Sequence, residues 1–558
     1  MARDLVRVLG LWRDRAGWLA LGAGTAIASA LLGLSLLLLA GQAVAGRAAG
    51  ASDAGAFALG GGAVALLLLR PLVLLRPASR WVERMVSHAA TFRALADLRV
   101  WFFRRLAERM PAGVGGRSSG DLLGRLVADV EALDALYLRA ILPALAALAA
   151  VLAAAFLLGG DPTLAALACL PLLLALLLPF ALAPSAARGA GEAATAQGRL
   201  RAAAVDPLIG VEDILAANAE ARAGAALERE AATLHGGRSA VARRSALGGA
   251  AGTLLVQAAL LGAIAWGLAA GGGALSMAAV VAVFLLVAVA EPMGALPRAG
   301  AGLAAAAAAA RRLFEAADTP ALVPEPPEAA ATDTPAGHAI RFEGVHFSWT
   351  ADRAPVFAGL DLEVSESARL LVLGASGSGK SSLAALLLKL AAPDAGRVTL
   401  GGVDIASLPA EAVRRRIACL TQDARLFDDS IAANLRIAAP GAPDAALWRA
   451  LDRAGIGELV RALPGGLHTD CGEGGARFSG GQARRLALAR VLLSAAPVLV
   501  LDEPTAGLDA VAERAFLETL EEATAGRTVM LLAHRVTGAE RPTRVLRLAG
   551  GRALAAAG

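Results

Sequence analysis

The chain has little charge, few cysteines and almost no lysine. Charged residues make up 18% of its 558 residues, whereas apolar residues make up 57%, which is too hydrophobic for an ordinary soluble protein. Cys169, Cys419 and Cys471 lie far apart without CxxC spacing, which excludes a disulfide framework or a cysteine-based zinc site. Lysine occurs only at positions 380 and 389, so arginine supplies nearly all the positive charge. The composition predicts a membrane protein with two or three domains.

Six apolar stretches in the first 312 residues are long enough to be membrane helices. A span needs about 20 helical residues to cross the hydrocarbon core of a bilayer. We expect the spans near residues 18–46, 56–76, 140–160, 162–184, 247–270 and 274–296. The first is too long for the apolar region of a signal peptide, and no convincing cleavage site follows it. We therefore interpret it as a retained helix.

The placement of arginine predicts the topology. Ten arginines lie between Arg76 and Arg125, and eight lie between Arg188 and Arg244, whereas the other three linkers between spans hold only Arg47. Basic residues stay on the cytoplasmic side of a membrane. We therefore expect an inner-membrane protein with both termini in the cytoplasm. The net charge of +5 is then explained by the arginines of the cytoplasmic segments. We therefore expect no nucleic acid as a partner.

The composition changes after the last span. Residues 317–338 are rich in proline and alanine, which is typical of a linker. Beyond them, short apolar runs alternate with helical stretches, which predicts an α/β domain with a largely parallel sheet. We therefore expect a multi-domain chain with an all-α six-helix transmembrane domain at 1–316, a linker at 317–338 and an α/β P-loop domain at 339–558.

The stretch "LLVLGASGSGKSSLAALLL" predicts a nucleotide-binding loop. Gly374, Gly379, Lys380 and Ser381 satisfy G-x-x-x-x-G-K-[ST] between a buried strand and a helix. Backbone N–H groups of such a loop bind phosphate oxygens, and a lysine reaches them where the wider fork of arginine does not fit. The expected ATP-binding residues of this loop are Gly374, Ser376, Gly377, Gly379, Lys380, Ser381 and Ser382.

Two acidic residues end the apolar strand in "VLVLDEPT". We expect Asp502 to hold Mg²⁺ together with Ser381, and Glu503 to polarise the water that attacks ATP. Paired acids at a strand end are often only solvated. Their position after a P-loop in the same domain favours the catalytic interpretation.

The stretch "RFSGGQARRLALAR" lies some twenty residues before the Asp502 strand. Its "FSGGQ" resembles the LSGGQ signature of the ATP-binding cassette (ABC) transporters, with Phe478 in place of the usual leucine. N–H groups at a helix start can bind phosphate. The resemblance implies that ATP held by a partner domain is bound here by Ser479, Gly480, Gly481 and Gln482.

Further motifs extend the resemblance over the whole chain. It implies that Gln422 in "LTQDARLF" is a catalytic residue that senses Mg²⁺, and that His534 in "LLAHR" contacts the γ-phosphate. It also implies that Asp509 in "AGLDA" contributes to the nucleotide site and that Trp349 in "VHFSW" stacks on adenine, unless Trp349 is a core residue. Six spans and one cassette are the layout of an exporter half-transporter, an ATP hydrolase coupled to transport that requires a second subunit.

The inner helices and the "DEPTAGLDA" stretch resemble those of the CydC subunits of heterodimeric CydDC exporters in bacterial inner membranes. That resemblance implies export of small thiols, cysteine and glutathione, in support of cytochrome bd assembly, with a CydD-like partner. It also implies an association with haem b, for which His88 is a candidate ligand unless it is only a helix-surface histidine. The alternatives are a multidrug or lipid exporter, homodimeric or not, and a haem-transporting or haem-binding ABC subunit. Arg70 within the second expected span either pairs with an anionic substrate or snorkels towards the cytoplasm.

Overall fold

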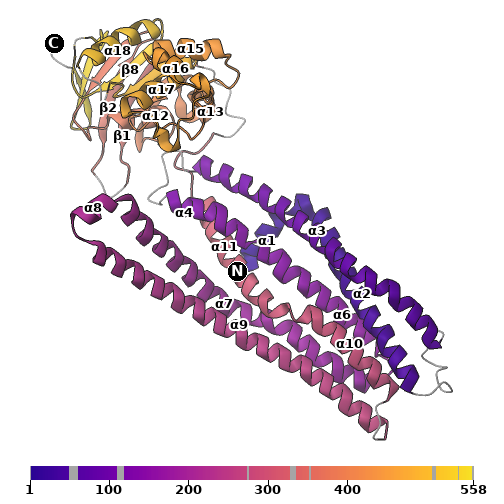
Figure 1. The fold of residues 1–558 in the computed structure, drawn as a ribbon. Coiled ribbons are helices and arrows are strands. Elements are labelled where there is room, and N and C mark those ends of the chain that lie inside the picture. Colours follow the sequence, from indigo (N-terminus) through magenta and orange to yellow (C-terminus); the bar gives the residue numbers. More distant parts are fainter. Residues whose placement is uncertain are drawn as a thin grey trace. The chain divides into compact units, whose positions relative to one another are not determined.

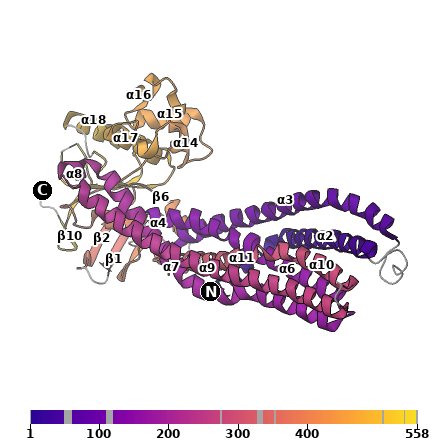
Figure 2. The same ribbon diagram turned by 60° about the horizontal axis from the view of Figure 1, so that its bottom comes forward.

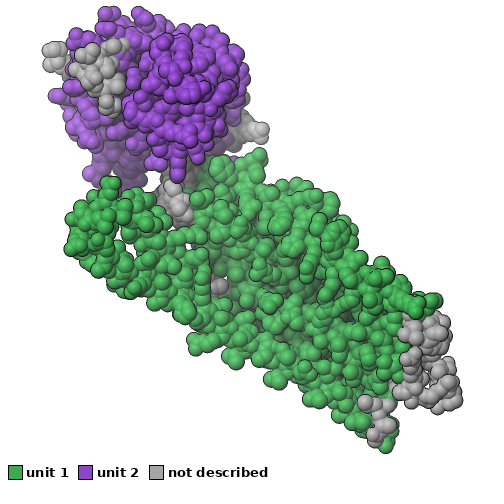
Figure 3. Space-filling view, viewed as in Figure 1, with its two compact units in different colours: residues 1–107, 116–319 green, residues 108–115, 320–558 purple. Residues whose placement is uncertain are grey.

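The computed structural model describes residues 2–48, 61–109, 119–272, 276–326, 335–350, 354–505, 510–537 and 539–555. The chain divides into two compact units (Figure 3). Unit 1 contains residues 1–107 and 116–319, and unit 2 contains residues 108–115 and 320–558. Each unit is described by itself below.

Unit 1 is built from helices alone among the residues that the structure describes. Its longer helices lie alongside one another over much of their length (Figures 1 and 2). Their bounds are α1 (Ala2–Leu11), α2 (Ala16–Ala48), α3 (Gly61–Arg109), α6 (Leu142–Leu157), α7 (Pro162–Ile209), α9 (Glu220–Ala270), α10 (Met277–Met293) and α11 (Leu296–Ala317). A short helix, α8 (Val211–Ala216), joins α7 to α9.

Five helical segments of the described residues are long and apolar enough to cross a membrane. They are Arg13–Ala45, Leu122–Leu157, Pro162–Pro184, Glu220–Ala270 and Ala278–Ala317. Each overlaps one of the expected spans. The expected span at 56–76 overlaps α3, but residues 56–60 lie outside the described part of the chain. The sixth span therefore stays a prediction.

Small side chains allow the helices of unit 1 to approach closely. Buried alanines dominate the contact of α6, α7, α9 and α10, including Ala147, Ala168, Ala259 and Ala282, each fully buried. Small residues at helix contacts are typical of membrane bundles, where dispersion rather than the hydrophobic effect favours association. The alanine content of this chain thus has a packing role in unit 1.

The helix expected after residue 119 is interrupted. The segment consists of α4 (Ser119–Gly124), a π-helix (Arg125–Asp129), α5 (Val130–Ala132) and a second π-helix (Ala135–Ile141) before α6. Wider π turns bring Asp129 into a buried position against α11. Periodicity predicted the helix but could not reveal these local changes of pitch.

Unit 2 contains two sheets, of which only the larger was expected. The larger sheet has the order β10-β9-β3-β8-β7-β6 and is parallel except for the β10–β9 pair. Its strands are β3 (Arg369–Leu373), β6 (Ile417–Leu420), β7 (Val498–Asp502), β8 (Thr528–Ala533), β9 (Arg544–Ala549) and β10 (Arg552–Ala555). The smaller, antiparallel sheet has the order β2-β1-β4-β5. Its strands are β1 (Ile340–Phe347), β2 (Phe357–Val364), β4 (Ala395–Leu400) and β5 (Val403–Asp404).

Both faces of the parallel sheet are covered. Alternate residues of β3, β7 and β8 contribute to two separate hydrophobic clusters, so these strands are continuous apolar runs. One cluster includes α12 (Lys380–Leu387) and the antiparallel sheet, and the other includes α14 (Ile431–Arg436), α15 (Asp444–Arg453), α17 (Gly480–Leu493) and α18 (Ala510–Ala523). The smaller sheet and α12 thus cover one face of the parallel sheet, and helices cover the other.

Strand order positions the candidate site. β3, β8 and β7 are parallel neighbours, with Leu373 paired to Ala533 and Asp502 paired to Leu532. Side chains that follow these strands therefore gather at one edge of the sheet, where ligands of open α/β sheets bind.

Candidate functional site

The loop between β3 and α12 has the backbone of a phosphate-binding loop. Gly377 and Gly379 have φ values of +79° and +100°, which glycine adopts without strain. A Cβ atom on Gly379 would lie 2.7 Å from Val356 and 2.8 Å from Phe357, so no other residue fits there. N–H groups at a helix N-terminus bind anions, so the loop and the start of α12 form a candidate phosphate site, in which Ser378 N–H donates to the Ala375 carbonyl at 3.1 Å.

Lys380 is buried at the start of α12. Its Nζ donates to the carbonyl oxygens of Gly374 at 2.8 Å and Ala375 at 3.1 Å, and it lies 3.4 Å from Nδ1 of His534. Two carbonyls of the loop thus hold the ammonium group inside the loop. Phosphate oxygens are stronger acceptors for this amine than carbonyls.

Asp502 fits a divalent cation. Ser381 Oγ donates to its Oδ2 at 2.6 Å, while its Oδ1 is buried without a hydrogen-bond partner. Burial raises the pKa of Asp502, an effect that the Ser381 hydrogen bond partly offsets. A hydroxyl and a carboxylate with an unused oxygen form a donor set that Mg²⁺ prefers. The cation would stabilise the buried charge and the charge that develops on the phosphates.

Glu503 has a strained backbone and lies against His534. Its φ of +50° is uncommon for a residue with a side chain, and its N–H donates to the Leu532 carbonyl at 2.9 Å. This conformation brings its carboxylate into contact with Nε2 of His534. His534 Nδ1 in turn lies 3.1 Å from the Gly374 carbonyl. Two expected catalytic residues, Glu503 and His534, therefore meet beside the loop.

Trp349 is at the surface and not in the core. It is 45% exposed, its ring packs edge-on against Phe347 at 5.1 Å, and its Nε1 donates to Ser382 Oγ at 3.0 Å. An exposed ring face beside the loop is what stacking on an adenine base requires. Ser376 and Gly377 lie at the turn of the loop itself.

The structure does not bring every expected site residue together. Ser479 and Gln482 form a capping box at the start of α17, with Gln482 N–H donating to Ser479 Oγ at 3.3 Å. Gly480 and Gly481 lie in the first turn of α17. The Gln422 side chain is exposed and makes no hydrogen bond among the described residues. Asp509 lies outside the described residues.

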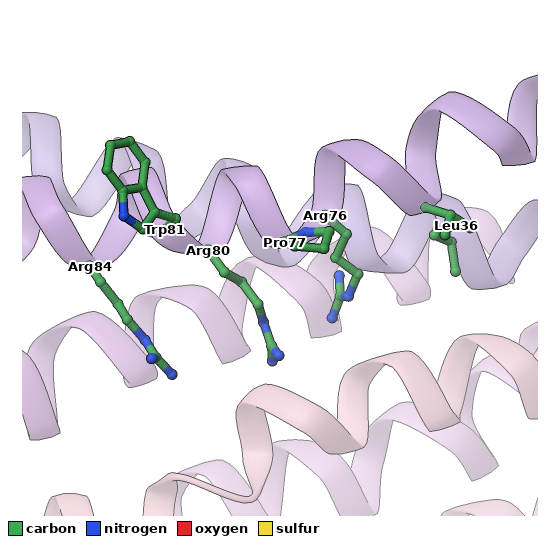
Figure 4. Close-up of a pocket in the computed structure, with 7 residues that line it drawn as sticks. Leu36, Arg76, Pro77, Arg80, Trp81 and Arg84 are labelled. Carbon is green, nitrogen blue, oxygen red and sulfur yellow. The ribbon is translucent and has the colours of Figure 1, made fainter.

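Three arginines of α3 line a pocket of about 560 Å³ that sequence reasoning missed. Arg76, Arg80 and Arg84 leave the helix on one side (Figure 4), as residues four apart do. Arg76 and Arg80 both contact the carboxylate of Glu291 in α10, and Arg76 Nη1 is buried without a hydrogen-bond partner. The i, i+4, i+8 spacing of arginine was the signal in the sequence.

His88, the candidate haem ligand, lies one turn beyond this pocket. It is exposed on α3, and its ring lies 5.7 Å from that of Phe92. Groups of three or more His, Cys, Asp or Glu side chains that could together hold a metal ion are absent among the described residues. Neither the geometry nor the comparisons below support haem.

Comparisons with known proteins agree with the geometry. The family model described as "ABC transporter" matches residues 357–506. The chain is 33% identical to the "Glutathione/L-cysteine transport system ATP-binding/permease protein CydC" of Escherichia coli, over 98% of this chain and 96% of that protein. It is 30% identical to the CydD protein of the same description from Bacillus subtilis, over 88% of this chain and 85% of that protein.

The fold is also that of a known exporter. A structure titled "Structure of a bacterial Atm1-family ABC exporter with ATP bound" aligns with a TM-score of 0.80 at 25% identity, over 94% of each chain. The "ATP-dependent lipid A-core flippase" of Chromohalobacter salexigens is 42% identical, but over only 37% of this chain and 36% of that protein.

Proposed function

Because this chain belongs to the ABC transporters of the exporter type, whose ATP hydrolysis drives transport across a membrane, we propose that it is one subunit of a heterodimeric exporter of cysteine and glutathione. The extent of similarity carries the proposal. The CydC relative aligns with 98% of the chain, whereas the lipid A-core flippases align with 37–44% of it. Similarity that includes the helical unit is informative because that unit contacts the substrate.

The pocket on α3 supports an anionic substrate. Arg76 and Arg80 contact the carboxylate of Glu291. Arg80 and Arg84 also interact electrostatically with Glu83. Three guanidinium groups and two carboxylates leave the region of the pocket with an excess of positive charge. An excess of positive charge in a pocket attracts an anionic ligand. The two carboxylates of glutathione match paired arginines.

In this proposal six spans cross the inner membrane and both termini and the cassette are cytoplasmic. The loop from Gly374 to Ser382 binds the phosphates of ATP, and Trp349 stacks on its adenine. Ser381, Gln422 and Asp502 hold Mg²⁺, which neutralises phosphate charge when bound. A water attacks the γ-phosphorus while Glu503 accepts its proton, the bond to the β–γ bridging oxygen breaks, and ADP and phosphate form. Assembly places Ser479–Gln482 and Asp509 at ATP held by the partner cassette.

Transport into inside-out vesicles tests this function. The chain is reconstituted with a CydD-like half-transporter, and ATP-dependent accumulation of labelled glutathione and cysteine is measured. Accumulation should occur and should be lost in a Glu503→Gln variant of the chain. A complex that hydrolyses ATP, accumulates neither thiol and is stimulated by lipid would instead be a lipid exporter. If His88 is a haem ligand, His88→Ala should change the absorbance spectrum of haem added to the complex. An unchanged spectrum would exclude His88 as a ligand.

A further inference from the structure

We propose that Arg484 is a positioning residue for ATP hydrolysis, which holds three catalytic segments of the cassette in one arrangement. The proposal rests on the functions proposed above for Gln422, Asp502 and Glu503. Arg484 lies in the first turns of α17, two residues after Gln482. Neither the ATP-binding loop nor the signature motif includes it.

One guanidinium group joins three backbone carbonyls. Nη1 of Arg484 donates to the carbonyl of Gln422 at 2.7 Å, and Nη2 donates to the carbonyl of Asp502 at 2.5 Å and to that of Glu503. Each of these carbonyls belongs to a residue for which a function in ATP hydrolysis is proposed above. Arg484 therefore fixes the main chain of all three residues without contacting the nucleotide.

The strained backbone of Glu503 explains why such a contact is needed. A residue with a side chain persists at positive φ only where its surroundings hold it there. Glu503, at φ +50°, is held on one side by its N–H bond to Leu532 and on the other by Arg484 at its carbonyl. Without Arg484, the peptide can relax and the carboxylate moves away from His534.

Arginine is the side chain that suits this role. Its planar group presents five N–H donors in fixed directions and stays charged when buried. Burial lowers the pKa of Arg484, and the carboxylates of Glu503 and Asp502 oppose that effect. Arg484 uses two separate nitrogen atoms for these bonds, whereas all three N–H donors of a lysine lie on one nitrogen atom and could not reach all three carbonyls at once.

Steady-state ATP hydrolysis by the assembled transporter tests the proposal. In Arg484→Ala, kcat should fall at least tenfold, while KM for ATP changes by less than twofold because the loop around Lys380 keeps its contacts. Arg484→Lys should recover only a small part of kcat. Guanidinium ion added at tens of millimolar should restore activity to Arg484→Ala several-fold, which loss of structure would not allow.

Arg527→Ala is the matched control. Arg527 is also a partly buried arginine that donates to a main-chain carbonyl, that of Ser494 at 3.0 Å, but at the opposite end of α17. The kcat of the Arg527→Ala variant should stay within twofold of the native value, and added guanidinium ion should not change it. The proposal is wrong if Arg484→Ala keeps its kcat, or if added guanidinium restores nothing. A Glu503→Gln variant that still hydrolyses ATP would overturn the proposed function of Glu503 instead.

Discussion

At the scale of residues, the two lysines of the chain occupy the two ends of α12. Lys380 begins the helix, and Lys389 follows its end with a φ of +51° and Nζ donating to the Leu408 carbonyl at 2.6 Å. Both are buried against main-chain carbonyls. A thin stem with a compact charge reaches such sites, whereas the wide fork of arginine does not. The sequence predicted a function for Lys380 alone.

The two lysines should respond differently to substitution. Lys389→Met leaves the buried Leu408 carbonyl without its donor, so we expect it to destabilise the cassette by about 1–3 kcal/mol without changing the affinity for ATP. Lys380→Ala should lower ATP affinity more than tenfold, with a smaller effect on stability. Nucleotide titrations and thermal unfolding of the two variants measure both quantities. If both variants lost the same amount of stability and the same amount of ATP affinity, the two lysines would not have the different functions proposed for them.

Two thiols of the cassette should make the stability of the folded protein depend on pH. Burial raises the pKa of Cys471 to about 11 and that of Cys419 to about 12, from 9.0. The folded state therefore favours the neutral thiols, and this contribution to stability is complete below pH 9 and is lost as pH rises towards 11. The unfolding temperature of the native protein should fall in that range, and less steeply in Cys471→Ala. At pH 8 both thiols should resist iodoacetamide until the protein unfolds.

At the scale of elements, two adjacent arginines of α11 have different environments. Arg312 makes a two-bond ion pair with the buried Asp129, at 2.9 and 2.5 Å, across to the π-helical segment. Arg311 pairs with Glu315 on the exposed side of the same helix. A helical repeat predicts that neighbouring residues face different directions, but the partner of Arg312 depends on tertiary packing.

Removing one partner of each pair should separate the two cases. Asp129→Ala leaves a guanidinium partly buried without its carboxylate, so we expect a loss of about 3–5 kcal/mol. Glu315→Ala should cost far less, because the pair is exposed to solvent. Thermal unfolding in detergent compares the two variants at the same ionic strength. Equal losses would show that the contact with Asp129 does not stabilise the helical unit.

The arginines of α3 should distinguish the two proposed thiols. Glutathione carries a net negative charge at neutral pH, whereas cysteine is a zwitterion. Arg84→Gln should therefore raise KM for glutathione by about tenfold and that for cysteine by less than threefold, as expected for one lost charge pair. Arg311→Gln, which alters an exposed arginine of α11, should change neither KM. Vesicle transport measures both. If Arg84→Gln changed KM equally for glutathione and cysteine, the pocket would not contribute to recognition of the substrate charge.

At the scale of the whole molecule, one chain carries one ATP-binding loop and one signature motif. In the cassette, Ser479 and Gln482 bond to each other, whereas Lys380, Ser381, Asp502, Glu503 and His534 form the connected group. In the proposed function, a second cassette completes the site. The chain purified alone should hydrolyse ATP at less than a tenth of the rate of the complex with a CydD-like subunit. Full activity of the chain alone would favour the homodimeric alternative.

The motifs of the cassette could be predicted because local sequence dictates them. A run of apolar residues followed by G-x-x-x-x-G-K-S places the loop between a strand and a helix, and the structure has β3 and α12 there. The antiparallel sheet and the function of Arg484 could not be predicted in this way. Strands β1, β2 and β4 pair across intervals of tens of residues, and Arg484 contacts carbonyls that any residue could supply.

The sequence by itself determined the family, the apolar helices and the ATP-binding loop, because these depend on composition, periodicity and short motifs. Only the tertiary structure decided that Glu503 and His534 meet, that Arg76 and Arg80 of α3 contact one carboxylate, and that one guanidinium group joins three separate main-chain carbonyls. These contacts join residues far apart in the chain. Their geometry follows from strand order and helix packing, which bring distant segments to within a few ångströms.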